Sequence, residues 1–233
     1  MSYSETDMER LGRSGGVFVA NPMIQKFPLV VSSPHSGRVY PPEFQKLSRV
    51  PIPDLRRSED RFVEGLLRGS KNLSIPVLSA SFSRSFIDLN RSPLDLDPLL
   101  IDNIPVSLVE GPINKKVQQG LGVIPRVAGS GAEIYGQRLS FSAARMRLLH
   151  YYFPYHKILR SLIRQTYKKF GLAILIDFHS MPSKTFLKDY GSEPIVVVGD
   201  CHGNSAQSKV ADAVVEILSG LGYQVFRNQP YSG

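Results

Sequence analysis

The sequence contains a single cysteine and no long apolar run among its 233 residues. Cys201 cannot form an intramolecular disulfide, which fits a reducing compartment. A membrane-spanning helix needs roughly 20 consecutive, predominantly apolar residues, and no stretch of the chain approaches that length. The first residues, Met1 to Asp7, are polar and acidic, unlike a signal for export. We therefore expect a cytoplasmic protein without a membrane partner.

Tracts of basic charge and glycine-rich phosphate loops are also missing. Lys and Arg outnumber Asp and Glu by 28 to 20, which gives a formal net charge of +8. The basic residues are scattered, often in pairs such as Arg56-Arg57 and Lys168-Lys169, and no tract resembles a nucleic-acid-binding arm. Neither glycine pattern that cradles a nucleotide phosphate occurs. The composition favours a solvated basic surface, and we expect no specific nucleic-acid partner.

The hydrophobic content of 42% is sufficient for one sizeable core. Residues 1–26 lack clear periodicity and carry turn-forming glycines, which predicts a loose N-terminal leader with a short strand at Val17–Val19. We expect residues 27–233 to form one domain. Within it, residues 92–136 are rich in Pro, Gly, Asp and Asn, which is typical of a functional lid or binding loop.

The apolar pattern of the chain predicts an α/β fold. Short apolar runs predict strands at residues 29–34, 75–80, 85–90, 172–176, 194–199 and 223–226. Helical spacing predicts helices at residues 58–67, 148–163 and 205–218, with Pro154 as a kink or as the start of a second helix. The strand, helix and strand near the C-terminus imply a crossover in a largely parallel sheet. We therefore predict a three-layer sandwich with a mixed, largely parallel sheet.

Two histidines directly follow predicted strands. His35 comes after residues 29–34, and His179 lies in Asp177-Phe178-His179-Ser180 at the end of residues 172–176, which we expect to be a buried strand. The carboxyl ends of strands in open α/β sheets are where ligands and catalytic groups collect. A lone histidine is most often a hydrogen-bonded core residue. The setting that these two histidines share favours a metal site instead.

A zinc site in a hydrolase would need a third protein ligand, with the fourth position left for water. A carboxylate can supply this ligand, and Glu59 and Asp60 are the best placed, at the start of the helix predicted to begin after Ser58. The spacing alone does not decide between them. We prefer Asp60, because Glu59 can merely serve the helix dipole. The predicted cofactor is Zn²⁺.

Asn90 and Arg91 are expected to end a further strand and to bind an anion. A guanidinium binds a carboxylate through two hydrogen bonds, and a neighbouring amide can add a third. The structural alternative is an ion pair of Arg91 with Asp88 or Asp95. The further candidates for anion binding, for which a surface salt bridge is an equal alternative, are Arg84 and Arg126. These residues predict a small anionic substrate.

Five short motifs occur in order along the chain. They are Ser33-Pro34-His35-Ser36-Gly37 followed by Tyr40-Pro41, Glu59-Asp60-Arg61-Phe62-Val63, Ser83-Arg84 continuing to Ile87-Asp88-Leu89-Asn90-Arg91, Pro154-Tyr155-His156, and Asp177-Phe178-His179-Ser180. Together they resemble the N-formylglutamate amidohydrolase family, from about Phe27 to the last residue. Any one motif would be weak, whereas five in order are specific.

That family is similar in fold to zinc carboxypeptidases and to the aspartoacylase group. The resemblance implies a zinc-dependent hydrolase that cleaves the amide bond of an N-acyl amino acid, here of the N-formylglutamate type with formate and glutamate as products. It assigns His35, Asp60 and His179 to the metal, Asn90 and Arg91 to the substrate carboxylate, and Arg126 to the acyl carbonyl.

The resemblance also concerns the last residues. Residues 228–233 look like the beginning of a family segment that continues to a strand with a glutamate, the expected general base. Without it the base is expected to be missing or to come from elsewhere, with Glu133 and Glu110 in the long loop as the nearest candidates. Zinc uptake with little turnover would follow. The alternative is a non-catalytic binding protein for an acidic metabolite that retains the metal pocket.

Overall fold

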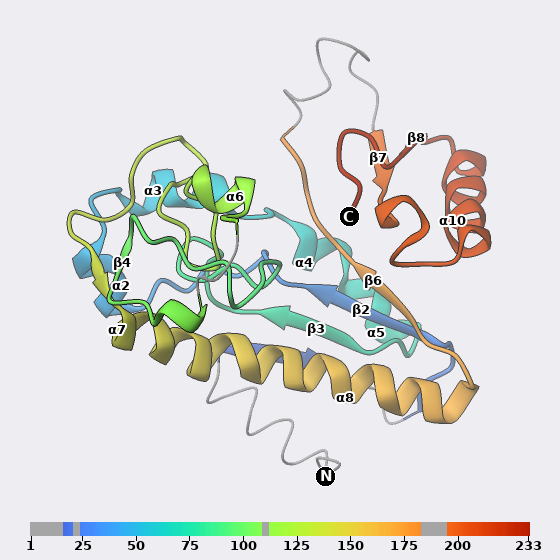
Figure 1. Ribbon diagram of the computed structural model, residues 1–233. Coiled ribbons are helices and arrows are strands. Elements are labelled where there is room, and N and C mark those ends of the chain that lie inside the picture. The colour runs from blue at the N-terminus through green and yellow to red at the C-terminus, as the bar shows by residue number, and fades with distance from the viewer. Residues whose placement is uncertain (1–15, 21–23, 109–111, 183–194) are drawn as a thin grey trace. The chain divides into compact units, whose positions relative to one another are not determined.

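The computed structural model describes residues 16–20, 24–108, 112–182 and 195–233, and the chain divides into two compact units (Figure 1). The N-terminal unit is Met1–Ser180 and the C-terminal unit is Met181–Gly233. The expectation of one domain over residues 27–233 stays a prediction. Most of the predicted leader lies outside the described residues.

A mixed four-stranded sheet with the order β1-β3-β2-β6 forms the centre of the N-terminal unit (Figure 1). Its strands are β1 (Val17–Ala20), β2 (Leu29–Ser33), β3 (Val77–Ala80) and β6 (Ile174–Asp177). β2 pairs in parallel with both β3 and β6, and β1 pairs antiparallel with β3. The strands are rich in Val, Ile and Leu, which suit a pleated sheet, and all four were predicted from this composition.

Several helices and two short strands complete the N-terminal unit. The helices include α2 (Pro42–Leu47), α3 (Ile52–Leu55), η1 (Arg56–Ser58), α4 (Val63–Leu66), α5 (Arg68–Asn72), η2 (Val106–Leu108), α6 (Lys115–Gln118), α7 (Phe141–Arg147), the π-helical η3 (Leu148–Tyr152) and α8 (Phe153–Phe170). The strands β4 (Ile101–Asp102) and β5 (Leu139–Ser140) pair in parallel.

Helices pack against both faces of the sheet because side chains alternate along β2. Val30 belongs to the main core, to which the long helix α8 contributes Ile158. Val31 belongs to a second cluster, to which α4 contributes Val63. In Figure 1, α8 runs along one face, and α4 and α5 lie on the other. The sheet is therefore packed against helices on both of its faces.

The helix predicted at residues 148–163 is part of a longer helical stretch. α7, η3 and α8 follow one another without a break, and Pro154 lies in the first turn of α8. A proline is tolerated there because its missing N–H has no partner to lose. Gly171 ends α8 with φ of 73°, in the left-handed region that favours glycine. Of the two predicted alternatives for Pro154, a kink or the start of a second helix, the structure has Pro154 as the second residue of α8, directly after the π-helical turn η3.

The strand predicted at residues 85–90 is wrong. The segment turns instead: the N–H of Phe86 donates to the Ser83 carbonyl, and the N–H of Asp88 donates to the Val123 carbonyl. Phe86, Ile87 and Leu89 are all buried, so the core surrounds this segment on several sides. An apolar run of this kind does not need the two-sided pattern of a strand. Asn90 and Arg91 consequently follow a turn and not a strand.

The helix predicted at residues 58–67 is also wrong in its start. Ser58 ends η1, Glu59 is extended, and α4 begins only at Val63. Phe62 has φ of 68°, a left-handed conformation that interrupts the helix and leaves its ring exposed. Asp60 therefore lies in a connecting segment instead of in the first helical turn.

β6 is less buried than predicted. Leu175 of this strand is 41% exposed. Among the described residues, β6 pairs only with β2 and is thus an edge strand of the four-stranded sheet.

The C-terminal unit is a β-α-β arrangement. It contains β7 (Ile195–Val198), η4 (Cys201–Gly203), α10 (Ser208–Gly220) and β8 (Gln224–Arg227), and β7 and β8 pair in parallel. The predicted elements of this region are confirmed.

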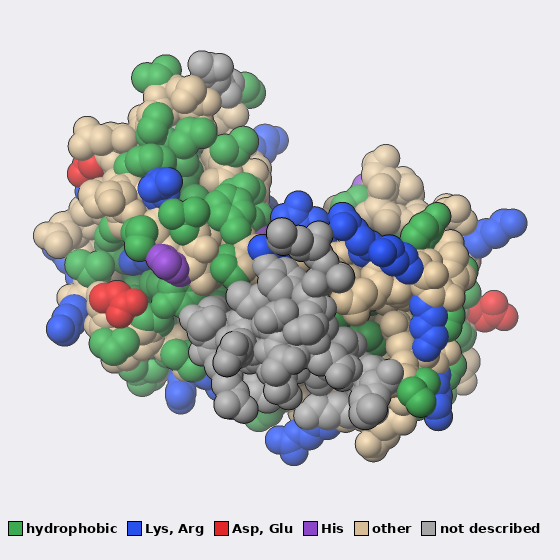
Figure 2. Space-filling view, turned by 90° about the horizontal axis from the view of Figure 1, so that it is seen from below, with side chains coloured by type: hydrophobic (Ala, Val, Ile, Leu, Met, Phe, Trp, Pro, Cys, Tyr) green, Lys and Arg blue, Asp and Glu red, His purple; other side chains and the backbone are tan. Residues whose placement is uncertain are grey.

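The structure confirms a mixed α/β chain with parallel strand pairs, and the carboxypeptidase-like likeness stays a prediction. No helix of the described residues is long and apolar enough to cross a membrane. On the face shown in Figure 2, basic side chains are more prominent than acidic ones, in keeping with the net charge of +8.

Candidate metal centre

The parallel pairing of β2 and β6 brings two histidines together. Ser32 of β2 is paired with Asp177 of β6, so both strands end at the same edge of the sheet. His35 and His179 each follow two residues after the end of their strand. Their ring centroids are 4.7 Å apart, and the ring planes are inclined by 53°. The two histidines, which both follow strands in the sequence, therefore lie next to each other in the fold.

Asp60 reaches both histidines from the segment between η1 and α4. Its backbone N–H donates to the His35 carbonyl over 3.0 Å, which anchors the segment beside the strand end. Its Oδ2 lies 2.8 Å from Nδ1 of His179 and 3.7 Å from Nδ1 of His35. Ligand atoms of the three residues all lie within 4.8 Å of one another. Protein atoms bound to one zinc ion are at most about 4 Å apart, so only a small approach separates this arrangement from a zinc site.

Glu59, the other candidate, points to a different group. Its Oε1 accepts a hydrogen bond of 2.6 Å from the Tyr40 hydroxyl, and the guanidinium groups of Arg38 and Arg56 lie 4.0 Å and 3.9 Å from its carboxylate. Burial, with the neighbouring Glu59 carboxylate, raises the pKa of Tyr40 well above its usual value. The hydroxyl therefore stays a donor. Of the two carboxylates that the sequence left open, Asp60 is the one that faces the histidines.

Each histidine uses its second ring nitrogen to contact another aspartate. His35 Nε2 lies 2.7 Å from Asp88 Oδ1, and His179 Nε2 lies 3.0 Å from Asp177 Oδ2. Metal-binding histidines commonly make this contact, because a carboxylate at one ring nitrogen fixes the ring and leaves the other nitrogen for the metal. Both rings thus present Nδ1 toward Asp60.

One atom of the cluster tests whether a metal ion fits. His35 Nδ1 is buried and has no hydrogen-bond partner among the described residues. A buried polar atom without a partner is uncommon in folded proteins, because it loses its hydration without compensation. A cation between His35, Asp60 and His179 would supply the missing interaction. The donor set of two imidazoles and one carboxylate is also one that zinc prefers.

The acidic surroundings shift the titration of the cluster. Burial opposes ionisation of Asp60, but the hydrogen bond with His179 and the nearby ring of His35 outweigh it and hold the pKa of Asp60 well below its usual value. Burial alone would lower the pKa of His179, but hydrogen bonds to Asp177 and Asp60 raise that pKa to about 9. The cluster therefore favours a positive charge, and metal binding would displace a proton from His179.

Asn90 joins the two outer aspartates. Its backbone N–H donates to Asp88 Oδ1 over 2.9 Å, and its Nδ2 donates to Asp177 Oδ2 over 2.9 Å. The same Nδ2 lies 2.8 Å from His179 Nε2. Asn90 thus lies at the candidate metal centre although it does not end a strand.

Two predicted anion-binding arginines lie around Asp88. Arg84 Nη2 donates to Asp88 Oδ2 over 2.7 Å, whereas Arg91 Nε is 4.0 Å from the same oxygen. This contact is the ion pair with Asp88 that the sequence left as an alternative for Arg91, at the long limit of such a pair. Arg91 Nε is buried without a hydrogen-bond partner among the described residues.

Arg126 has different partners. Its Nε donates to Asp97 over 2.9 Å and its Nη1 donates to Glu133 over 3.0 Å, and the bond to Asp97 is the main reason that the pKa of Arg126 is raised. Glu133, one candidate for the general base, thus pairs with Arg126. Glu110, the other candidate, lies outside the described residues. The predicted roles of Arg126 and of both glutamates stay predictions.

Asp88 and Asp177 are contacts of the candidate site that sequence reasoning did not assign to it. Both belong to the motifs quoted above, and each precedes a predicted site residue, Asn90 or His179, by two positions. That spacing was the available signal.

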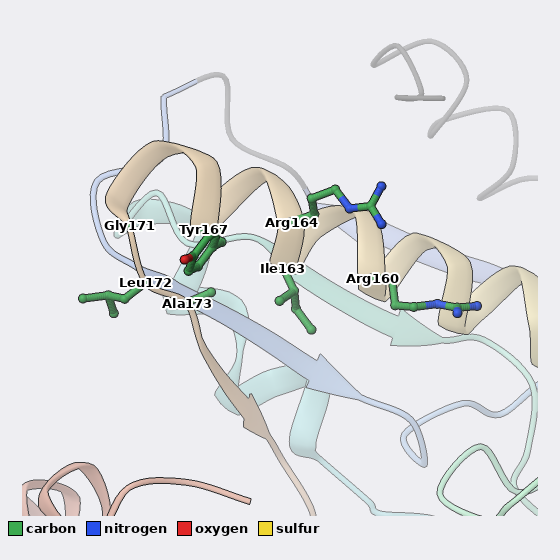
Figure 3. Close-up of a pocket in the computed structure, with 7 residues that line it drawn as sticks. All are labelled: Arg160, Ile163, Arg164, Tyr167, Gly171, Leu172 and Ala173. Carbon is green, nitrogen blue, oxygen red and sulfur yellow. The ribbon is translucent and has the colours of Figure 1, made fainter.

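A groove of about 540 Å³ lies elsewhere, at the C-terminal end of α8 (Figure 3). It is lined by Arg160, Ile163, Arg164, Tyr167, Gly171, Leu172 and Ala173. None of the predicted site residues lines it.

These features define a mixed α/β protein with a candidate metal centre where two parallel strands end. A family model described as N-formylglutamate amidohydrolase matches residues 27–233. The chain belongs to this family, as the five motifs indicated.

Individual relatives agree with this assignment. The chain is 28% identical over 218 residues to an N-formylglutamate deformylase of Pseudomonas putida, which covers 89% of this chain and 72% of the relative. It is similar, with a TM-score of 0.82 and 31% identity, to the crystal structure of an N-formylglutamate amidohydrolase from Ralstonia eutropha JMP134, over 94% of this chain and 78% of that one. A structure of gene product Atu2144 from Agrobacterium tumefaciens, with a TM-score of 0.66, 20% identity and coverage of 96% and 75%, shows a likeness of fold alone.

Proposed function

We propose that this chain is a zinc-dependent amidohydrolase that cleaves N-formylglutamate into formate and glutamate. The observation that carries the proposal is the convergence of His35, Asp60 and His179 within 4.8 Å at the end of two parallel strands. The names of the relatives from Pseudomonas putida and Ralstonia eutropha support the substrate. The single cysteine supports a reducing compartment, and we include the cytoplasm in the proposal.

His35 and His179 would hold the ion through Nδ1, and Asp60 would hold it through its carboxylate. When bound, zinc would lower the pKa of a coordinated water to about 7 and polarise the formyl carbonyl. Three protein ligands leave a position for that water. Asp88 and Asp177 keep the two imidazole rings oriented through the bonds at Nε2.

The arginines beside Asp88 would bind the carboxylates of the substrate. The side chains of Arg84 and Arg91 are 27% and 24% exposed, so each has solvent access in addition to its contact with Asp88. A guanidinium carries five N–H donors, and one acceptor cannot occupy them all. Asn90 would add its amide next to His179. Arg126 is proposed to bind the acyl carbonyl, as the family resemblance implies.

The proposal is tested by zinc uptake and turnover together. The purified chain is stripped with a chelator and titrated with zinc, and release of glutamate from N-formylglutamate is measured with and without the metal. We expect one zinc per chain and activity that returns with zinc. His35→Ala and His179→Ala should lose zinc binding, whereas His150→Ala, which removes an exposed histidine, should keep it.

Two results would contradict the proposal. Full activity after complete removal of metal would show that the reaction does not need zinc. Binding of N-formylglutamate by the zinc-loaded chain without release of glutamate would favour the alternative, a non-catalytic binding protein for an acidic metabolite.

A further inference from the structure

Asp88 is a buried carboxylate surrounded by polar neighbours. It is 2% exposed, and it contacts His35 Nε2 at 2.7 Å, Arg84 Nη2 at 2.7 Å and the N–H of Asn90 at 2.9 Å. We infer that Asp88 is a positioning residue that holds His35 in the tautomer with the proton on Nε2 and so reserves Nδ1 for the metal. The inference deepens the proposed function and rests on its metal site.

The neighbours of Asp88 fix which partner donates. The guanidinium of Arg84 and the backbone N–H of Asn90 can only donate, so both carboxylate oxygens of Asp88 act as acceptors. An ionised carboxylate has no proton to give. His35 Nε2, at 2.7 Å from one of these oxygens, must therefore carry the hydrogen of that bond.

The other nitrogen of the ring is then left without a proton. A neutral imidazole carries one N–H, and in His35 that N–H faces Asp88. Within the described part of the chain Nδ1 has no hydrogen-bond partner, and its separation of 3.7 Å from Asp60 Oδ2 is too long for a hydrogen bond. Its lone pair consequently points at no donor of the described residues. This is the state that a metal ligand needs before the ion arrives.

The His179 side of the centre lacks this constraint. The side chain of Asp177 is 33% exposed, and Asn90 Nδ2 lies near His179 Nε2 at 2.8 Å in addition to Asp177. A donor and an acceptor at the same ring nitrogen accommodate either tautomer. Only Asp88 imposes one tautomer by its surroundings.

Asp88→Asn tests the inference because an amide offers one acceptor and one donor. In the parent chain Oδ1 of Asp88 contacts both His35 Nε2 and the Asn90 N–H, and Oδ2 accepts from Arg84. The charged guanidinium of Arg84 forms the strongest of these bonds and takes the single amide oxygen, so the Asn90 N–H loses its acceptor as well. The NH₂ group then faces His35 Nε2, which must accept, so the proton moves to Nδ1. Zinc affinity, measured by titration of the metal-free chain with zinc alone, should fall roughly 10-fold to 100-fold.

Asp97→Asn is the matched control for zinc affinity. Asp97 is 1% exposed and accepts a hydrogen bond of 2.9 Å from Arg126, so it shares the burial and the arginine partner of Asp88. The zinc affinity of Asp97→Asn should remain within about twofold of that of the parent chain. This change is much smaller than the loss expected when a residue that hydrogen-bonds to a metal ligand is replaced. Equal zinc affinity in Asp88→Asn and the parent would overturn the inference.

A second measurement does not depend on the folding of any variant. Nitrogen-15 NMR of the histidines in the metal-free parent chain reports which ring nitrogen carries the proton. We expect His35 to be protonated on Nε2 at a pH where the ring is neutral. A proton on Nδ1 would overturn the inference whatever the zinc result. A parent chain that shows the expected tautomer and takes up no zinc would contradict the proposed metal site instead.

Discussion

The two histidines of the candidate metal centre make the same contacts in different surroundings. The side chains of His35 and Asp88 are each 3% exposed, whereas those of His179 and Asp177 are 35% and 33% exposed. In the buried half the carboxylate is neutralised by protein groups, above all Arg84, and in the exposed half water shares that task. From this difference we expect the fold to depend on the buried carboxylate of Asp88 more than on the exposed carboxylate of Asp177.

The largest effect should come from removing the buried carboxylate. Asp88→Ala leaves the buried ring of His35 without its partner and removes the ion pair with the partly exposed Arg84, and we expect the free energy of unfolding to fall by about 3 kcal/mol. Asp177→Ala breaks a solvent-screened contact and should cost about 1 kcal/mol or less. Urea denaturation of the metal-free variants measures both values. Equal losses would remove the distinction between the two halves.

The next effect concerns the segment that carries Asp60. Tyr40→Phe removes the donor to the buried carboxylate of Glu59, and we expect a loss of about 1 to 3 kcal/mol in the free energy of unfolding. Tyr167→Phe, at a tyrosine that is 60% exposed, is the matched control and should change stability by less than about 0.5 kcal/mol. Indistinguishable denaturation midpoints in the two variants would show that Glu59 does not support this segment.

Arg91 lies beside Asp88 of the buried half and tests substrate binding. Arg91→Lys keeps the charge but loses the planar fork, so KM for N-formylglutamate should rise about tenfold, equivalent to about 1.4 kcal/mol. Arg145→Lys, at an exposed arginine, should leave KM unchanged. Steady-state kinetics of the zinc-loaded enzymes provide the comparison. The same KM in Arg91→Lys and the parent chain would exclude a bidentate contact with the substrate.

The smallest effect is a pH dependence at His156, which supports the buried half from α8. Its Nε2 contacts the Leu89 carbonyl at 3.0 Å, and burial lowers the pKa of His156 below the ordinary value of 6.5. The unfolded chain then binds more protons than the folded chain just below pH 6.5, so stability is lost as the pH falls through this range.

The contribution of His156 is isolated by comparison with His156→Gln. Subtracting the unfolding free energies of His156→Gln from those of the parent chain between pH 5 and 8 should give a difference that declines on the acid side. A difference that is constant over this range would contradict the shift in the pKa of His156.

Strand ends were the part of the site that the sequence could predict. Short apolar runs with β-branched residues identify β2 and β6, and a residue directly after such a run must lie at the sheet edge. His35 and His179 follow from this logic alone. Asp60 was preferred over Glu59, but spacing alone did not decide between them, because the choice depends on a tertiary contact, the bond from the Asp60 N–H to the His35 carbonyl. The spacing of neighbouring residues in the sequence does not predict that bond.

Segments surrounded by the core were the part that the sequence could not predict. The apolar residues of the Asp88 turn read as a strand because periodicity does not separate a strand from a chain that is buried on all sides. Phe62 read as helical because a left-handed phenylalanine is costly and is adopted only where the rest of the fold imposes it. Because of the strand wrongly predicted at residues 85–90 and the helix wrongly predicted to start at Ser58, the contacts of Asp88 and Asp60 with the histidines could not be predicted.

The register between β2 and β6 has a consequence for folding fidelity. Because side chains alternate along a strand, a slip of β6 by one residue would direct Asp177 to the opposite face and misplace His179 relative to His35. A chain with the slipped register would lack the candidate metal centre. If the centre binds a metal ion, the ion would bind only chains in which β2 and β6 are correctly aligned. By mass action it would shift the equilibrium away from the slipped register and toward the correct one.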